Sequence, residues 1–174
     1  MAANPDYIVL KRHRDLVGLR HYVWLRRGLL VVLFAFLVYG LLNGFGQRPG
    51  TTTTETEAAR LELYAPSRVR GGLYFQARFH IDAVREMRDA TLVLDPGWAE
   101  GMTINTIEPS PIGEASRDGK LTLELGHIPQ GQSYLLFMQV QVNPTNVGHR
   151  TQNVELFDGK KHLVTIHRTI TIFP

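Results

Sequence analysis

The sequence contains no cysteine, and this absence excludes three kinds of chemistry at once. Without thiols the chain can form no disulfide, no thiolate metal site and no cysteine nucleophile. Exported domains often depend on disulfides, so an exported domain of this chain would have to depend on its hydrophobic core. A length of 174 residues suffices for one domain with such a core and an appendage.

Motifs of familiar catalytic sites are also missing from the sequence. It contains no G-x-S-x-G, no H-E-x-x-H and no glycine-rich phosphate-binding loop. The carboxylates are scattered over positions that we expect to be turns or outward strand faces, so no acid and base should converge in a cleft. We therefore expect a protein that binds rather than catalyses, with no cofactor and no resident metal.

Acidic residues are scarce near the N-terminus, where up to Arg48 only Asp6 and Asp15 oppose seven basic residues. This part carries a net charge of +5, which leaves −2 for the rest of a chain whose total is +3. A basic excess confined to one end and followed by an apolar run is typical of membrane topology, because a nucleic-acid-binding domain spreads its basic face over a fold. We expect no nucleic-acid partner.

Charge is absent altogether from residues 28–47, which read GLLVVLFAFLVYGLLNGFGQ. Because a helix of about 20 apolar residues crosses the hydrocarbon layer, this segment predicts one transmembrane helix in the lipid bilayer. Arg26 and Arg27 precede it, whereas only Arg48 follows before a neutral threonine run. The positive-inside rule then places residues 1–27 in the cytoplasm and the C-terminal part outside the cell membrane.

Two alternatives to this single-pass anchor are open. A buried core helix would need a polar face, which the nearly unbroken apolar run does not provide. A signal peptide cleaved after Gly46 is the stronger alternative, because Gly44 and Gly46 form a small-x-small pattern. The long charged region ahead of the apolar run favours an uncleaved signal-anchor.

Two further features are associated with the expected helix. Gly40 and Gly44 form a G-x-x-x-G step, with Asn43 beside it, at which a partner helix could approach closely. Residues 6–27 interleave apolar and basic side chains at a partly helical spacing, which suits the inner leaflet and its anionic lipid. The glycine step is also explained by the ordinary composition of a helix end. The basic residues are also explained as a topology signal alone. Both of these alternatives stay open.

The segment after the helix contains almost nothing that can be buried. Residues 48–58 are Thr-rich and predict an extended linker between the membrane and a domain formed by residues 59–174. Within that domain Phe75, Ala77 and Phe79 alternate with Gln76 and Arg78, and the same period of two recurs along the chain. One face of each such strand should pack against the core, and the other should face solvent.

Turn sequences such as Asp158-Gly159 separate the alternating runs and indicate hairpins. We count seven or eight strands and expect an all-β, antiparallel immunoglobulin-like β-sandwich, since each one-faced sheet needs a second sheet to cover it. A small barrel is the second possibility. Residues 83–89 (AVREMRD) are expected to form a short helical turn or a loop that crosses between the sheets.

A family resemblance lies in the turn residues of residues 90–157. The sequence has Leu94-Asp95-Pro96-Gly97, then LELGHIPQGQS at 123–133, an apolar strand, Val147-Gly148 and Asn153-Val154. This order resembles the conserved-repeat immunoglobulin-like domains of bacterial surface proteins. The resemblance implies a sandwich fold with a scaffolding or binding role and no enzyme activity. The chain differs from those repeats in having one copy and an N-terminal anchor.

Four side chains of the outer domain are candidate surface contacts: Arg68, Arg70, Tyr74 and Trp98. The two arginines lie in the sequence SRVRGG, whose open backbone could accept an anionic group, although a solvated turn also explains it. Tyr74 and Trp98 could present an aromatic platform to a sugar. An aromatic residue beside a turn also commonly seals the end of a sandwich, which is the alternative for Trp98.

Histidines are the remaining candidates for chemistry, with two methionines as soft companions for copper. They are His80, His127, His149, His162, His167, Met87 and Met102. His162 and His167 lie five residues apart on one expected strand and therefore on opposite faces, so they should not chelate one ion together.

These observations favour an accessory or assembly subunit that contacts a larger membrane or envelope protein complex through its outer domain. A cell-wall or polysaccharide binding module is the first alternative and requires an exposed aromatic platform. An extracytoplasmic metal-handling protein is the second alternative and requires histidines that converge in space.

Overall fold

The computed structural model describes residues 20–44 and 46–174. The chain divides after Gly44 into two compact units: the described residues of the first form a helix and its cap, and the second is a β domain. Most of the basic segment expected to meet anionic lipid, including Lys11, Arg12 and Arg14, lies outside the described residues.

Helix α1 spans Arg20–Leu41, and its residues His21–Leu41 are long and apolar enough to cross a membrane. The predicted bounds of 28 and 47 are therefore wrong at both ends. The helix ends early because Asn43 adopts a left-handed conformation with φ 58°. The N–H of Gly44 donates to the Tyr39 carbonyl at 2.9 Å and that of Asn43 to the Gly40 carbonyl at 3.0 Å, which caps the last turn.

The described residues of the β domain form twelve strands and one short 3₁₀ helix. The strands are β1 (Arg48–Glu55), β2 (Ala59–Arg70), β3 (Tyr74–Ala83), β4 (Met87–Leu94), β5 (Met102–Glu108), β6 (Gly113–Arg117), β7 (Lys120–Ile128), β8 (Ser133–Val142), β9 (Gly148–Thr151), β10 (Val154–Asp158), β11 (Lys161–Ile166) and β12 (Thr169–Phe173). The 3₁₀ helix η3 spans Pro96–Trp98.

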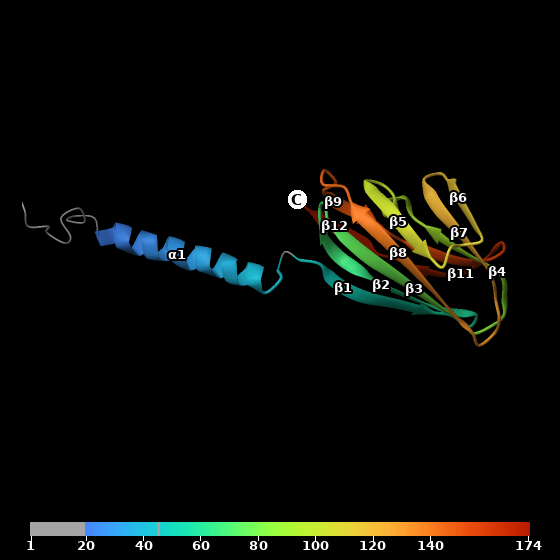
Figure 1. The fold of residues 1–174 in the computed structure, drawn as a ribbon. Helices are drawn as coiled ribbons and strands as arrows, with labels where there is room; N and C mark the ends of the chain where they lie inside the picture. The colour runs from blue at the N-terminus through green and yellow to red at the C-terminus, as the bar shows by residue number, and fades with distance from the viewer. Residues whose placement is uncertain (1–19, 45) are drawn as a thin grey trace, which may run out of the picture. The chain divides into compact units, whose positions relative to one another are not determined.

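These strands make two sheets that pack face to face as a sandwich (Figure 1). The larger sheet has the order β5-β8-β3-β2-β12-β9, with β1 also paired to β2, and the smaller sheet has the order β11-β10-β4-β7-β6. The predicted all-β sandwich is confirmed, although β12 pairs with β2 in parallel. The predicted number of seven or eight strands is wrong, because short edge strands such as β6 and β9 bury almost none of their side chains and show no apolar alternation.

The core follows the period of two along each long strand. On β2 the side chains of Leu61 and Leu63 are fully buried, while those of Glu62 and Tyr64 lie on the outer face. On β8 Leu136, Met138 and Val140 are likewise buried. Burial of such alternating side chains between two sheets supplies the main stabilisation that a cysteine-free domain has.

The Thr-rich segment is a strand and not a linker. β1 pairs with β2 over eight positions, from Arg48 opposite Arg68 to Glu55 opposite Arg60. Its side chains are nearly all exposed, so backbone pairing and the β-branched threonines account for the strand, and no apolar burial signals it in the sequence. The β domain therefore begins before residue 59.

The crossing between the sheets takes place where the sequence predicts it. The chain passes from β3 in the larger sheet to β4 in the smaller sheet through residues 84–86. These residues form a bend rather than a helical turn, so the loop alternative is correct.

Candidate functional site

The outer face of the larger sheet carries a row of side chains that spans four strands. Tyr64 on β2 lies opposite Arg78 on β3, Arg78 lies opposite Phe137 on β8, and Phe137 lies opposite Glu108 on β5. Residues directly opposite each other in a sheet project from the same face and contact each other. We call the outward side chains of this region the contact face: Tyr64, Tyr74, Gln76, Arg78, Leu135, Phe137 and Gln139.

A shallow groove of about 410 Å³ lies on one side of this row. Its lining residues come from β3, β5 and β8, and they are Gln76, Thr106, Glu108, Phe137 and Gln139. The groove thus combines one aromatic ring with amide, hydroxyl and carboxylate groups, which suits a ligand that offers both apolar and hydrogen-bonding atoms.

A second groove of about 420 Å³ lies on the other side, across β1, β2, β3 and β8. It is lined by Thr51, Glu62, Tyr64, Arg78, His80 and Leu135. Leu135 is 43% exposed although it belongs to a long strand of a sheet interior. Tyrosine and arginine are enriched at protein-protein interfaces, and the exposed leucine beside them adds apolar area.

Arg78 lines the second groove and lies opposite Phe137, which lines the first. Its guanidinium carbon lies 4.1 Å from the centroid of the Tyr64 ring, and its buried Nε has no hydrogen-bond partner. Among the residues that the structure describes, no carboxylate forms an ion pair with it. Arg78 therefore presents a planar cation that is stacked, held in place and not neutralised.

A serine, an aspartate and a histidine meet at the end of the second groove. The Asp82 Oδ1 atom accepts a hydrogen bond from Ser133 Oγ at 2.5 Å and lies 3.2 Å from His80 Nε2. The carboxylate stands between the other two groups, whereas in a nucleophilic triad the histidine stands between serine and carboxylate. This order places no imidazole beside the serine, and the hydrogen bond from Ser133 to Asp82 links β8 to β3.

Trp98 is not a surface residue, so its prediction as a surface contact is wrong and its role at the end of the sandwich is the correct alternative. Its side chain is 0% exposed, and its ring packs against Phe79 with centroids 5.5 Å apart. Gly97 permits this burial, because a Cβ at that position would lie 2.1 Å from the Thr151 carbonyl oxygen. Tyr74, by contrast, is 60% exposed.

The sequence SRVRGG does not form an open backbone cradle. The N–H groups of Gly71, Gly72 and Leu73 donate to the carbonyls of Phe173, Val142 and Arg70. Arg70 Nε donates to the Pro174 backbone oxygen at 2.9 Å, and Arg68 is half-buried on β2. The predicted anion cradle is therefore wrong in its backbone part, although both arginine side chains remain on the outer face.

The histidines do not converge. Within residues 20–44 and 46–174, no three His, Asp or Glu side chains are grouped so that they could hold a metal ion. His127 pairs with Glu86, His149 with Thr171 and His162 with Thr165, on different strands. Met87 and Met102 are core residues.

Gly40 and Gly44 do not share one helical face, because Gly44 lies beyond Leu41 in the cap of α1. A Cβ at Gly44 would lie 2.4 Å from the Tyr39 ring, so this glycine serves the cap. The predicted helix-helix step of Gly40, Asn43 and Gly44 is therefore wrong in its geometry.

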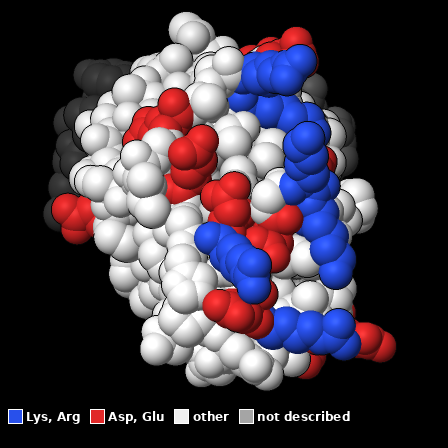
Figure 2. Space-filling view, turned by 90° about the vertical axis from the view of Figure 1, so that its right-hand side faces the viewer, with Lys and Arg blue, Asp and Glu red and all other residues white. Residues whose placement is uncertain are grey.

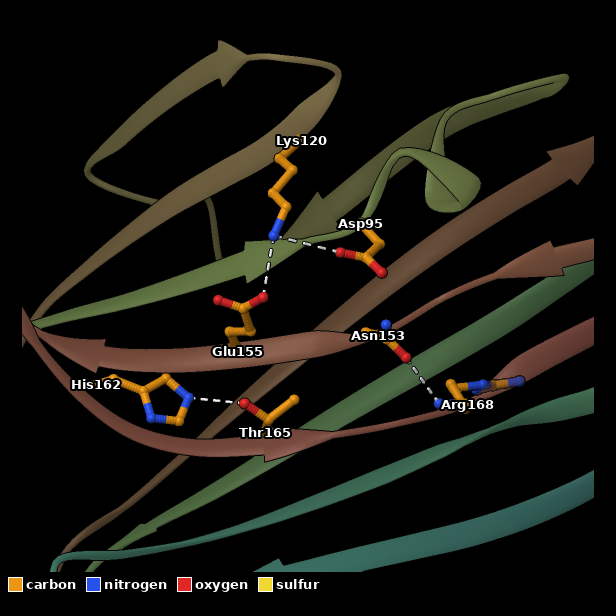
Figure 3. Close-up of polar contacts among 7 residues, drawn as sticks. All are labelled: Asp95, Lys120, Asn153, Glu155, His162, Thr165 and Arg168. Carbon is orange, nitrogen blue, oxygen red and sulfur yellow. Dashed lines mark hydrogen bonds and ion pairs between the residues drawn. The ribbon is translucent and has the colours of Figure 1, made fainter.

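Polar groups also gather around β7 and β10, where they hold the fold (Figure 3). Lys120 Nζ lies 3.0 Å from Glu155 Oε1 and 3.5 Å from Asp95 Oδ1, and the hydrogen bond to Glu155 is the main cause that raises the pKa of Lys120. Asn153 Oδ1 accepts the Arg168 backbone N–H at 3.1 Å.

The Arg168 side chain covers the buried end of the sandwich. Its guanidinium lies 5.4 Å from the Trp98 ring centroid, and Nη2 donates to the Pro66 carbonyl at 2.6 Å. Burial lowers the pKa of Arg168 to about 10. These contacts tie neighbouring strands together, so this cluster of polar groups supports the fold.

Most residues of the contact face were not predicted from the sequence. Tyr64, Leu135, Phe137 and Gln139 were not candidates there, because outward positions were interpreted as solvent-facing. One signal was present: the run Leu135-Leu136-Phe137-Met138 is continuously apolar, so it must place apolar side chains on the outer face as well as in the core.

No family model and no curated protein match the chain. Solved structures with a similar arrangement include the chitin-binding domain of a chitinase from Pyrococcus furiosus, at 13% identity and a TM-score of 0.43 over 66% of this chain and 100% of that one. A non-cellulosomal cohesin from Archaeoglobus fulgidus matches at 15% identity and a TM-score of 0.40, over 63% of this chain and 88% of that one. CaCohA2 from Clostridium acetobutylicum matches at 12% identity and a TM-score of 0.44, over 68% and 93%. Similarity at this level concerns the sandwich arrangement alone, and the functional argument depends on the residues of the chain itself.

Proposed function

We propose that the chain is a single-pass membrane protein whose β domain lies outside the cytoplasm and binds a protein of a larger membrane or envelope complex without catalysing a reaction. The apolar helix His21–Leu41 supports the anchor. The excess of basic residues before the apolar run supports an N-terminus in the cytoplasm.

The observation that carries the proposal is the cross-strand row of Tyr64, Arg78 and Phe137 with exposed Leu135 beside it. Aromatic and arginine side chains are enriched where proteins bind each other, and they supply most of the binding energy. Arg78 is stacked in advance, so little side-chain freedom is lost when a partner covers it.

The anchor compensates for the small size of this surface. A domain tethered to a bilayer meets other proteins of the same membrane at a high effective concentration, so a weak interface is still occupied. The partner is therefore expected to be a membrane protein or a component held at the membrane.

The test is purification from native membranes in mild detergent, with identification of the proteins that accompany the chain. The double variant Leu135→Ser, Phe137→Ser should lose the partner. The matched control, Val93→Ser, Phe157→Ser, makes the same chemical change on the outer face of the smaller sheet and should keep it. Equal recovery of the partner with both variants, each with unchanged thermal unfolding, contradicts the proposal.

A cell-wall or polysaccharide module is the second candidate, and exposed Tyr74 favours it. Tyr74 lies opposite Gln141, and Gln76 lies opposite Gln139, so one aromatic ring is bordered by amides that could bind sugar hydroxyls. Sedimentation of the purified chain with isolated cell wall, lost in Tyr74→Ala, would favour this candidate over a protein partner.

A further inference from the structure

A second feature of the larger sheet is a line of cationic side chains near the start of β1. Arg68 on β2 is the register partner of Arg48 on β1 and of Thr171 on β12, and Thr171 is the register partner of His149 on β9. Arg70 projects from the same face as Arg68 because the two are two residues apart on one strand. We call Arg48, Arg68 and Arg70 the arginine row.

Among the described residues the arginine row has no aspartate or glutamate partner, and Arg70 Nε donates to the Pro174 oxygen at 2.9 Å. In the described part of the chain no Asp or Glu forms an ion pair with any of the three side chains. Arg48 and Arg68 are moreover like charges placed directly opposite each other, which destabilises a sheet unless an anion lies beside them. An anionic partner would relieve this repulsion.

The opposite end of the domain also carries basic side chains, and some of them are paired with carboxylates. Figure 2 looks at the end marked by β4 in Figure 1 and shows Lys and Arg side chains next to Asp and Glu. At that end Arg85 pairs with Glu57 at 3.0 Å. Arg88, Lys160 and Lys161 nevertheless have no ion pair among the described residues, so the place of the arginine row in the chain, and not its charge alone, distinguishes it from the far end.

The form of the site favours a surface of anionic headgroups over one small anion. The neighbouring backbone N–H groups of Gly71, Gly72 and Leu73 all donate to carbonyls inside the fold, so these three groups are not available to bind a free phosphate. The row is instead spread over two strands on an outer face, where several headgroups can be met at once.

The position of the row in the chain points to the same partner. Only residues 42–47 separate the end of α1 at Leu41 from Arg48. Seven extended steps reach at most about 25 Å. Arg48, the first member of the row, therefore cannot lie farther than this from the end of the apolar helix, whatever the arrangement of the two units.

We infer that the arginine row binds anionic lipid headgroups of the membrane surface from which the helix emerges, and so orients the β domain on that surface. The inference depends on the membrane anchor of the proposed function. It leaves the contact face on β2, β3 and β8 for a partner, since the row lies on β1 and on the C-terminal end of β2.

The absence of cysteine allows a direct test. A donor dye is attached to a single cysteine introduced by Thr145→Cys. Thr145 lies in the exposed turn after β8, and this turn is close to Gly71, where a Cβ would lie 3.0 Å from the Pro144 oxygen. The full chain is reconstituted into vesicles of phosphatidylcholine, with or without phosphatidylglycerol, that contain a headgroup-labelled acceptor lipid. Energy transfer should be higher in the anionic vesicles and should fall with added salt.

The neutralised variant Arg48→Gln, Arg68→Gln, Arg70→Gln should lower transfer in anionic vesicles to the level of neutral vesicles. Each basic residue near an anionic membrane strengthens attachment about fivefold, so three of them change the docking equilibrium about a hundredfold. The control Arg88→Gln, Lys160→Gln, Lys161→Gln removes the same charge from the far end and should leave transfer unchanged.

Equal transfer in the two kinds of vesicle, or equal loss in the two variants, overturns the inference. Extraction of the same vesicles with alkaline carbonate separates the two levels of the proposal. A chain that stays inserted but shows equal transfer contradicts the arginine row alone, whereas a chain that is stripped from the vesicles contradicts the anchor and the inference with it.

Discussion

The Arg78 guanidinium lies over the Tyr64 ring, 4.1 Å from its centroid, and the two residues are register partners on β3 and β2. This stack fixes two side chains that line the same groove. Because it is formed in the free protein, the contact face is organised before any partner arrives.

The first prediction concerns this stack. Arg78→Lys keeps the charge but loses the planar group that stacks on Tyr64, so partner recovery should fall about tenfold. The free energy of unfolding should change by less than about 1 kcal/mol, since cation-π contacts at exposed sites are weak. Arg60→Lys is the control, because Arg60 lies on β2 in a surface pair with Glu62. If the two lysine variants recover the same amount of partner, Arg78 is not part of the interface.

The second prediction concerns the register of the strands. Phe79 is fully buried against Trp98, so Phe79→Ala should lower the free energy of unfolding by about 3–5 kcal/mol in urea titrations. Gln139 is exposed on β8, and Gln139→Ala should cost less than about 0.5 kcal/mol. Similar losses at the two positions would mean that the inward and outward faces are assigned wrongly.

The third prediction concerns an irregularity in β4. Asp158 Oδ1 accepts the backbone N–H groups of Arg88 and Asp89, each at 2.9 Å, where the β4–β7 register shifts. Asp158→Ala leaves both donors without this acceptor and should cost about 1–3 kcal/mol. Asp158→Asn keeps an acceptor oxygen and should cost clearly less. If the two variants unfold at the same urea concentration, the two hydrogen bonds to Asp158 do not account for its effect on stability.

The fourth prediction concerns pH. Glu155 and Asp95 raise the pKa of Lys120 above its usual value of about 10.5, so the folded state binds this proton more tightly than the unfolded state. The resulting stability is present below about pH 10.5 and is lost as the pH rises through the raised pKa. Solvent screening limits it to about 1 kcal/mol, because the side chain is 39% exposed.

The measurement for Lys120 is the difference in unfolding free energy between the unchanged protein and Lys120→Met. This difference should be constant from neutral pH to about pH 10 and should shrink above it. A difference that grows at alkaline pH would have the wrong sign for a stabilising ion pair.

Much of the sandwich could be predicted because its long strands bury every second side chain. Phe75, Ala77 and Phe79 on β3 read as one face of a strand, and the structure buries all three. β1 could not be found in this way, since its stability comes from backbone pairing with β2 and its threonines stay exposed. The early end of α1 depends on the left-handed Asn43, a single-residue effect inside an apolar run.

The candidate site was harder to predict than the fold. Tyr74 was identified as exposed, but Trp98 was placed on the surface as one alternative although Gly97 lets it turn inward. The row of Tyr64, Arg78 and Phe137 joins residues far apart in the sequence, and only the strand pairing brings them together. Alternation shows which face a residue is on, but not which strand lies beside it.

The most direct test of the contact face is photo-cross-linking in the native membrane, with a photoreactive phenylalanine analogue in place of Phe137 and, separately, in place of Phe157. Phe137 lies on the outer face of the larger sheet and Phe157 on that of the smaller sheet. We predict a discrete adduct with a protein from position 137 and none from position 157. An adduct from position 157 alone, or none from either position in a folded and inserted chain, would contradict the proposed function.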